Sequence, residues 1–63
     1  MRQFLMDNNT VVIATAFEDF TMAIDSETGD DIIPMSKETL ESDFDCRMII
    51  YDRIPNVTII KEL

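Results

Sequence analysis

Residues 25–45 read DSETGDDIIPMSKETLESDFD and determine most of the predicted topology, because they hold the only glycine, one of the two prolines and the clearest helix signal. Gly29 can adopt a positive φ without a Cβ clash, so residues 26–29 predict a hairpin loop and residues 30–33 its returning strand. Pro34 should end that strand, since proline lacks the amide donor that a central ladder needs. The chain after Pro34 must therefore leave the sheet or lie on its edge.

One helix is predicted, over residues 37–44. Ser36 is a suitable N-cap, and Leu40 and Phe44 lie four residues apart, which is the spacing of a buried helical stripe. Asp45 would then lie at the C-terminal end of the helix, where the helix dipole disfavours a carboxylate. We therefore expect a short helix that is partly destabilised by its own acidic residues.

The N-terminal third predicts a β-hairpin. Residues 3–6 are a short apolar run, residues 7–9 are Asp-Asn-Asn, which tolerate left-handed turns, and residues 10–17 form an apolar, β-branched run. Because residues 10–17 are apolar on both faces, we expect a central strand. Residues 20–25 alternate with the period of a strand, and a short helix over residues 16–24 is the alternative.

The last third predicts two more strands, residues 46–53 and 57–62, which a turn at residues 54–56 joins as antiparallel neighbours. Cys46, at the start of the first of these, is expected to be a small, half-buried core thiol. The expected architecture of residues 1–63 is a single small α+β domain. It would have a bent antiparallel sheet of five or six short strands, open or closed into a small barrel, with one helix covering a face or an end.

Negative charge is concentrated in the middle of the chain. Residues 18–45 contain ten acidic residues against one base, Lys37, so their net charge is −9, whereas the flanks carry +1 and the whole chain −8. Nucleic acids and anionic membranes need a cationic footprint, so direct binding to either is disfavoured and a basic protein partner is favoured. The same acids could instead serve only to keep a small hydrophobic chain soluble.

The composition argues against an enzyme. There is no histidine to act as a base or to activate Cys46, and the acids cluster in predicted loops and on a helix surface, so we expect neither catalysis nor a cofactor. Residues 25–31 superficially match a calcium loop, but the glycine falls at position 5 where the motif needs position 6, so we expect no metal site. A single cysteine, the lack of a signal-peptide pattern and the lack of an apolar run of about 18 residues predict a cytoplasmic protein that does not span a membrane.

The pattern of residues 24–36, IDSETGDDIIPMS, followed by Leu40 and Phe44, resembles the hairpin, proline and phenylalanine-bearing helix of small phage-encoded β-rich proteins of the PGDYG type. The resemblance covers about a third of the chain, and the Pro-Gly-Asp-Tyr-Gly run itself is absent, so no functional residue is carried over. It implies an origin in a phage or mobile element, where small acidic proteins often bind and disable host machinery. Such an origin would place the chain in the host-cell cytoplasm.

We therefore expect a non-enzymatic inhibitor or modulator that occupies a basic, nucleic-acid-binding surface of a host protein such as a nuclease or polymerase. Carboxylates spaced roughly 5 to 7 Å apart along a strand or helix can imitate a row of phosphates. The residues expected to contact the partner are Glu27, Asp30, Asp31, Glu38, Glu41, Asp43, Asp45 and the aromatic anchor Tyr51. The alternative is a structural or assembly subunit that forms homo-oligomers through sheet edges, because residues 57–60 carry no charge to protect such an edge.

Overall fold

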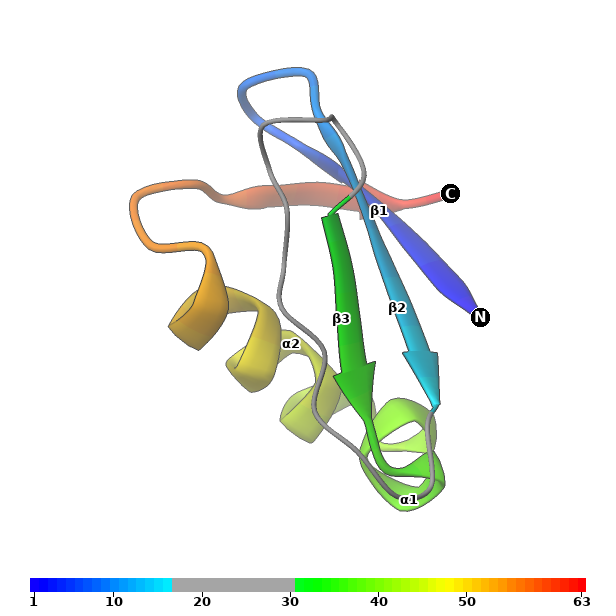
Figure 1. Cartoon of the computed structure of the whole chain (residues 1–63). Coiled ribbons are helices and arrows are strands. Elements are labelled where there is room, and N and C mark those ends of the chain that lie inside the picture. Colours follow the sequence, from blue (N-terminus) through cyan, green and yellow to red (C-terminus); the bar gives the residue numbers. More distant parts are fainter. Residues whose placement is uncertain (17–30) are drawn as a thin grey trace.

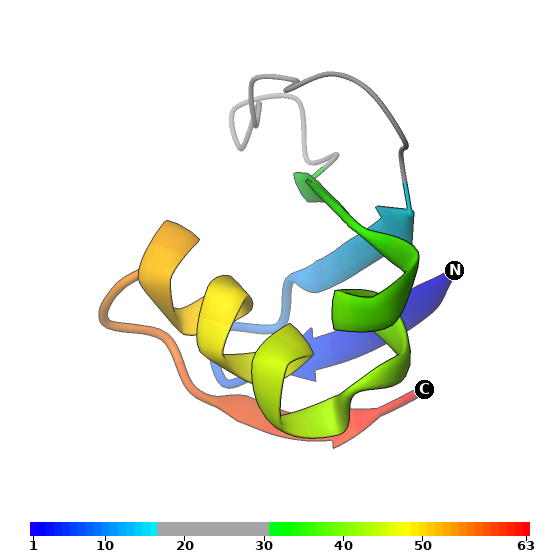
Figure 2. The same ribbon diagram turned by 90° about the horizontal axis from the view of Figure 1, so that it is seen from below.

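The computed structural model describes residues 1–16 and 31–63 (Figure 1). These residues form an α+β fold, as predicted, whose elements are β1 (Arg2–Met6), β2 (Val11–Ala16), β3 (Asp31–Met35), α1 (Lys37–Glu41), α2 (Asp43–Arg53) and β4 (Ile59–Glu62). The four strands form one mixed sheet in the order β3-β2-β1-β4, so β3 and β4 are its opposite edges (Figure 2). Helix α2 lies against one face of the sheet, and α1 lies at the end where β2 and β3 finish.

The predicted N-terminal hairpin is confirmed. Strands β1 and β2 are antiparallel, and β2 is a central strand between β1 and β3, as its apolar faces predict. In the turn, Asn9 has a φ of 70°, and Asn8 Oδ1 accepts hydrogen bonds from the backbone N and the hydroxyl of Thr10 at 3.0 and 2.6 Å. Asparagine tolerates a positive φ and bonds to nearby backbone, which is why this pair of residues can reverse the chain.

Strand β3 extends further than the strand predicted over residues 30–33, and it has a parallel partner that the sequence analysis did not predict. It pairs in parallel with β2 and continues through Pro34 to Met35, so the prediction that Pro34 ends the strand is wrong. Among the described strands β3 pairs only with β2, and an edge strand tolerates proline because one side of its backbone needs no ladder donor. The strand predicted over residues 20–25 and the loop over residues 26–29 lie outside the described residues, as does most of the alternative helix.

The single helix predicted over residues 37–44 is instead two helices that meet at Ser42. Ser36 is the N-cap of α1, as predicted, and its Oγ accepts a hydrogen bond from the backbone N three residues later at 3.1 Å. Ser42 has extended backbone angles (φ −84°, ψ 109°), and its N–H donates to Glu38 O at 3.0 Å, which ends α1. Its Oγ accepts from Asp45 N at 3.4 Å, so the same serine begins α2.

Residues 46–53, which were predicted to form a strand, belong instead to helix α2, so that prediction is wrong. Cys46 and Ile50 are both fully buried, whereas Met48 between them is 55% exposed. A strand would place all three side chains on one face, so this pattern is that of a helix. Asp45 lies in the first turn of α2, where the helix dipole favours a carboxylate, and not at the unfavourable end of a longer first helix. Phe44, predicted to be buried, is 72% exposed.

The C-terminal strand is present, but its partner differs from the one predicted. Strand β4 pairs antiparallel with β1, with a register shift between Leu5 and Met6, and not with residues 46–53. The turn predicted at residues 54–56 is present, with Asn56 at a φ of 70°, but it connects a helix to a strand. The described sheet therefore has four strands instead of five or six, is mixed instead of antiparallel, and is not closed into a barrel.

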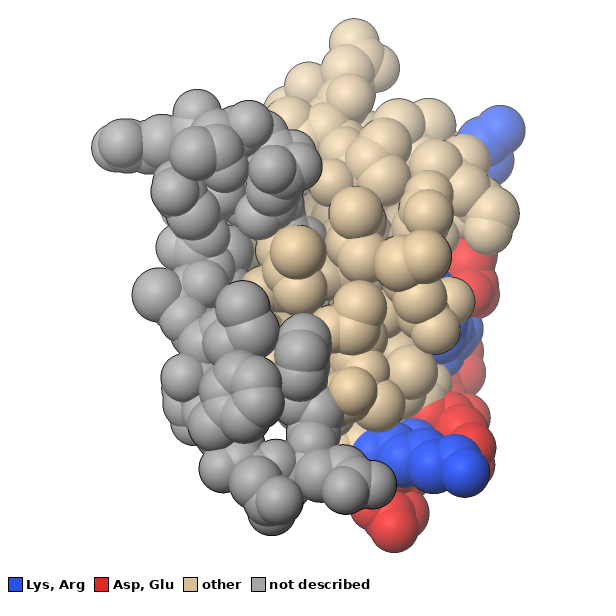
Figure 3. All heavy atoms as spheres, turned by 45° about the vertical axis from the view of Figure 1, so that its right-hand side comes forward, with Lys and Arg blue, Asp and Glu red and all other residues tan. Residues whose placement is uncertain are grey.

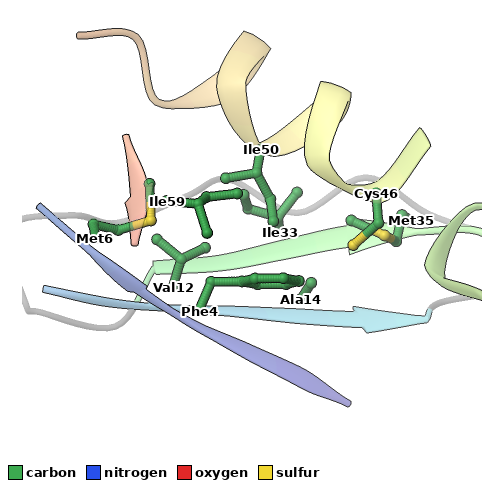
Figure 4. Close-up of a cluster of buried hydrophobic side chains, with 9 residues drawn as sticks. All are labelled: Phe4, Met6, Val12, Ala14, Ile33, Met35, Cys46, Ile50 and Ile59. Atoms are coloured by element: carbon green, nitrogen blue, oxygen red, sulfur yellow. The ribbon is translucent and has the colours of Figure 1, made fainter. Parts of the chain in front are cut away.

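The core lies between the sheet and α2 (Figure 4). All four strands and α2 contribute to it, through Phe4, Met6, Val12, Ala14, Ile33, Met35, Cys46, Ile50 and Ile59. Cys46 is thus confirmed as a core thiol, more deeply buried than expected, and burial raises its pKa. Leu40 of α1 packs half-buried against this core. None of the described helices is long and apolar enough to cross a membrane.

The face of the sheet that points away from α2 is mostly apolar as well. Its side chains are half-buried and belong to Gln3, Leu5, Val11, Ile13, Thr15, Ile32 and Pro34. Figure 3 looks toward this side and shows a broad uncharged surface, with the charged side chains gathered along one edge. Most antiparallel sheets that are open on one face alternate apolar and polar residues, so this face departs from the usual pattern.

Candidate protein-binding surface

The predicted contact residues fall into two groups in the structure. Glu27 and Asp30 lie outside the described residues, and Asp31 is the first residue of β3. The other five are exposed on the two adjoining helices: Glu38 and Glu41 on α1, and Asp43, Asp45 and Tyr51 on α2. The break at Ser42 is therefore what places these side chains on two helices instead of one.

Asp43 is exposed, but it is already paired with two arginines. Its carboxylate accepts hydrogen bonds from Arg2 Nη2 at 2.6 Å and from Arg47 Nε at 3.1 Å. These bonds hold the pKa of the Asp43 carboxyl below its ordinary value of 3.8. A carboxylate with two arginine partners has less capacity for a third cation, so its contacts favour a structural role over the predicted role in binding.

Arg2 joins both helices to the sheet, and nothing in the sequence analysis singled it out. Besides the bond to Asp43, it donates from Nη1 to Leu40 O at 3.0 Å and from Nε and Nη2 to the Glu62 carboxylate at 2.9 and 2.6 Å. Its guanidinium lies 5.1 Å from the ring centroid of Phe4, and its side chain is only 19% exposed. The hydrogen bonds from Arg2 lower the pKa of Glu62, and its two carboxylate partners raise the pKa of Arg2 itself.

Four other carboxylates of the helices are exposed and form no ion pair with any described residue: Glu38, Glu41, Asp45 and Asp52. The arginines that could have neutralised them, Arg2 and Arg47, are bonded to Asp43 and Glu62. Lys37 and Arg53 are also exposed on these helices, so the acidic surface of the helices includes two basic residues. Six of the ten acids of residues 18–45 precede α1, and most of the negative charge therefore comes from before the helices.

The outward side of α2 carries an apolar stripe that the sequence analysis missed. Phe44, Met48 and Tyr51 are 72%, 55% and 40% exposed, although they are among the largest apolar side chains of the protein. Their spacing of four and three residues places them within about 60° of one another around the helix axis. The side chains of Cys46 and Ile50 point the other way, into the core (Figure 4). We call Phe44, Met48 and Tyr51 the outward stripe.

The two borders of the outward stripe differ in charge. Asp45 and Asp52 are seven residues apart, so they share one side of α2 and line that border with exposed carboxylates. On the other border Arg47 is bonded to Asp43, and the charges of these two side chains cancel, so this border carries no net charge. The stripe is therefore an apolar surface with one acidic border.

Tyr51 is fixed in place at the end of the stripe. Its hydroxyl accepts a hydrogen bond from the backbone N of Ile59 at 3.0 Å, which ties the ring to the start of β4. The prediction that Tyr51 is an exposed aromatic residue is confirmed at 40% exposure, although it lies on a helix and not on a strand. A ring held in this way loses little further conformational freedom when a partner covers it.

Cys46 is the one thiol of the chain, and the acidic side chains are its candidate metal ligands. Among residues 1–16 and 31–63, no group of three or more His, Cys, Asp or Glu side chains is placed to hold a metal ion. Cys46 is buried, and its raised pKa disfavours the thiolate that nucleophilic chemistry would need.

Comparisons of the chain with protein-family models, with curated proteins and with solved structures find no match.

Proposed function

We propose that this chain is a non-enzymatic binding protein that attaches to a basic surface of another protein. The observation that carries the proposal is the set of exposed carboxylates on α1 and α2, Glu38, Glu41 and Asp45, which have no described cationic partner. Asp43 and Glu62 engage the arginines of this region, so the remaining acids keep their charge available for an external cation.

The proposed partner surface is one that normally binds nucleic acid. Glu38 and Glu41 are three residues apart on α1, which separates their Cβ atoms by roughly 5 to 6 Å and approximates the spacing of charges along a phosphate backbone. A net charge of −8 on 63 residues accelerates encounter with a cationic groove. Together with the phage-type resemblance, this supports an inhibitor or modulator of a host nuclease or polymerase that acts in the cytoplasm.

The proposal is tested by a pull-down from host lysate over a salt series, followed by competition with duplex DNA. We expect one basic protein to be captured at low salt, released at high salt and displaced by the DNA, because both ligands would compete for the same groove. Reversal of the three helix acids, in the variant Glu38→Lys/Glu41→Lys/Asp45→Lys, should abolish capture while the circular dichroism spectrum is kept.

A matched control is the pair of single reversals Glu41→Lys and Asp7→Lys. Both side chains are exposed and both substitutions change the net charge by the same amount, but Asp7 lies in the β1–β2 turn and not on the helices. Glu41→Lys should weaken capture more than Asp7→Lys. Equal weakening would mean that only the overall charge matters, and full retention of binding by the folded triple variant would refute the proposal.

Self-association is the second candidate function, and the uncharged outward face of the sheet favours it (Figure 3). Pairing through sheet edges is less favoured, since β3 carries Pro34 and β4 is a four-residue strand with Lys61 and Glu62. Native mass spectrometry separates the two candidates. A monomer that captures a basic protein in a salt-sensitive manner supports the first, and a stable higher homo-oligomer supports the second.

A further inference from the structure

We propose that the outward stripe of α2 docks an amphipathic helix of the partner whose apolar side is bordered by lysine or arginine. This inference rests on the proposed function and specifies how contact is made. Exposed apolar side chains scattered singly are normal on a protein surface, but three large ones within one arc of one helix form a contiguous strip.

The dimensions of the stripe suit a helix as the occupant. From Phe44 to Tyr51 it covers two helical turns, or about 10 Å along α2, and helices that pack on each other do so at an axial separation of about 8 to 10 Å. Apolar anchors spaced i, i+4 and i+7 are the form in which a helix presents itself to another helix. A docked helix would cover Met48 from the middle of the stripe, with Phe44 and Tyr51 at its ends.

Charge determines the kind of helix that fits. Asp45 and Asp52 form an exposed acidic border, and no described residue pairs with either of them. A helix with lysine or arginine beside its apolar anchors would place cations against this border, whereas a helix with acidic flanks would be repelled. The same border disfavours an anionic membrane surface as the occupant.

A second copy of this chain fits the stripe less well than a basic helix. In a twofold dimer each copy contributes the same surface, so stripe-to-stripe packing in an antiparallel sense brings Asp45 of one copy near Asp52 of the other. Two carboxylates in contact repel each other. The acidic border thus favours a different, basic molecule.

Tyr51 and its neighbours in the stripe would contribute most of the binding energy. The fluorescence of Tyr51 can also be used to measure binding. The ring is held by the bond to Ile59 N, and rigid aromatic side chains dominate the energetics of most interfaces. Tyr51 is the only tyrosine and the chain has no tryptophan, so its fluorescence reports directly on the stripe. Phe44→Ser and Met48→Ser leave this reporter in place.

The probe is a peptide of about 14 residues, roughly 21 Å long as a helix, with leucines on one side and lysines on the other and no aromatic residue. It should change the Tyr51 fluorescence saturably, and a matched peptide with glutamate in place of lysine should not. Phe44→Ser or Met48→Ser should raise the Kd for the lysine peptide by about tenfold, which is typical of loss of an apolar anchor. The control Ile60→Ser removes a side chain of similar exposure, 58%, from β4 and should leave the Kd unchanged.

The docking proposal is overturned by no saturable binding, by equal Kd values for the wild type and both stripe variants, or by a Kd for the glutamate peptide as low as that for the lysine peptide. Concentration-dependent dimerisation that Phe44→Ser abolishes would also overturn it, because a second copy would then be the occupant. Host-protein capture keeps the two proposals separate. If the triple acid reversal abolishes capture and Phe44→Ser does not, the basic-surface proposal stands and the stripe proposal fails.

Discussion

The two sides of α2 carry similar side chains in opposite environments. On the inner side Cys46 and Ile50 are completely buried, and on the outer side Phe44 and Met48 are 72% and 55% exposed. Hydrophobicity alone therefore does not decide which side faces the sheet. The inner residues are smaller or β-branched and pack against the face of the sheet, whereas the outer ones are large and reach into solvent.

The contrast between the two sides identifies the interactions that hold α2 in place. Its N-terminal end is fixed by the cap at Ser42 and by the bond from Arg2 of β1 to Asp43, and its middle is fixed by the buried side of the helix. Among the described residues, the outward stripe makes one hydrogen bond to another element, from Ile59 N to the Tyr51 hydroxyl. Stability and binding therefore divide between the two sides, and substitutions can separate them.

The largest expected effect is on the inner side. Ile50→Ala should lower the free energy of unfolding by about 2 to 5 kcal/mol, because it leaves a cavity in the core. A chain of 63 residues has roughly 3 to 9 kcal/mol in total, so this variant is expected to be largely unfolded near 37 °C. Urea denaturation followed by circular dichroism measures the loss, and Ile50→Val should give a smaller loss of about 0.5 to 1.5 kcal/mol.

The matched substitution on the outer side is Met48→Ala, which should change the free energy of unfolding by no more than about 0.5 kcal/mol. If it instead costs as much as Ile50→Ala, the outer side is buried in solution and the comparison of the two sides is wrong. Sedimentation equilibrium on the same sample would then identify a second copy as the covering molecule.

The next effect concerns the N-terminal end of α2. Arg2→Gln removes the guanidinium that bonds to Asp43, Glu62 and Leu40 O, and should lower the free energy of unfolding by about 1 to 2 kcal/mol. Thermal denaturation at low and high salt measures this effect. The difference in Tm between the wild type and Arg2→Gln should become smaller in high salt, because salt screens the ion pairs. Arg53→Gln, at the exposed C-terminal end of α2, is the control and should have a much smaller effect.

How far the sequence could predict this arrangement depends on how local each signal is. The hairpin of β1 and β2, with Asn8 and Asn9 in its turn, and the cap at Ser36 follow from neighbouring residues and are confirmed. The segment of residues 46–53 contains Ile49, Ile50 and Tyr51, which suit a strand, and the structure overrides this local preference by packing the segment against the sheet as a helix. The cap at Ser42 with Asp45 three residues later, followed by apolar residues three and four apart, was the available signal for α2.

Because residues 46–53 were predicted to be a strand, the outward stripe of α2 was not predicted. Residues three apart, such as Met48 and Tyr51, lie on opposite faces of a strand but on the same side of a helix, so the strand interpretation could not bring them together. The acids Glu38, Glu41 and Asp45 were predicted from charge alone, and they are exposed. The pairing of Asp43 with Arg2 could not be predicted, because it joins residues 41 positions apart through the tertiary fold.

A smaller effect is expected from pH. The pKa values of Asp43 and Glu62 are lowered in the folded state, chiefly by the hydrogen bonds from Arg2, so both carboxyls bind protons less readily when folded than when unfolded. Their contribution to stability is therefore complete above their ordinary pKa values of 3.8 and 4.5 and is lost as the pH falls through the lower folded values. Chemical denaturation at a series of pH values from about 6 to 2 should show stability falling at the acid end.

Arg2→Gln provides the control for the pH series. Without the guanidinium, the folded and unfolded pKa values of the two carboxyls should be similar, so the acid-induced loss of stability should become shallower. An unchanged slope would show that the ion pairs at the N-terminal end of α2 contribute nothing to folding in solution, and that the core side alone holds the helix.

The smallest expected effect on stability, and the sharpest separation of the two sides of α2, comes from Phe44→Ser. The side chain is 72% exposed, so its removal should change the free energy of unfolding by no more than about 0.5 kcal/mol, although phenylalanine is among the largest apolar residues. If exposure of this ring serves binding, the variant should lose affinity for the basic peptide while its urea midpoint stays that of the wild type. A large drop in the urea midpoint would instead place Phe44 among the residues that hold the fold, and the outer side of α2 would no longer be free for a partner.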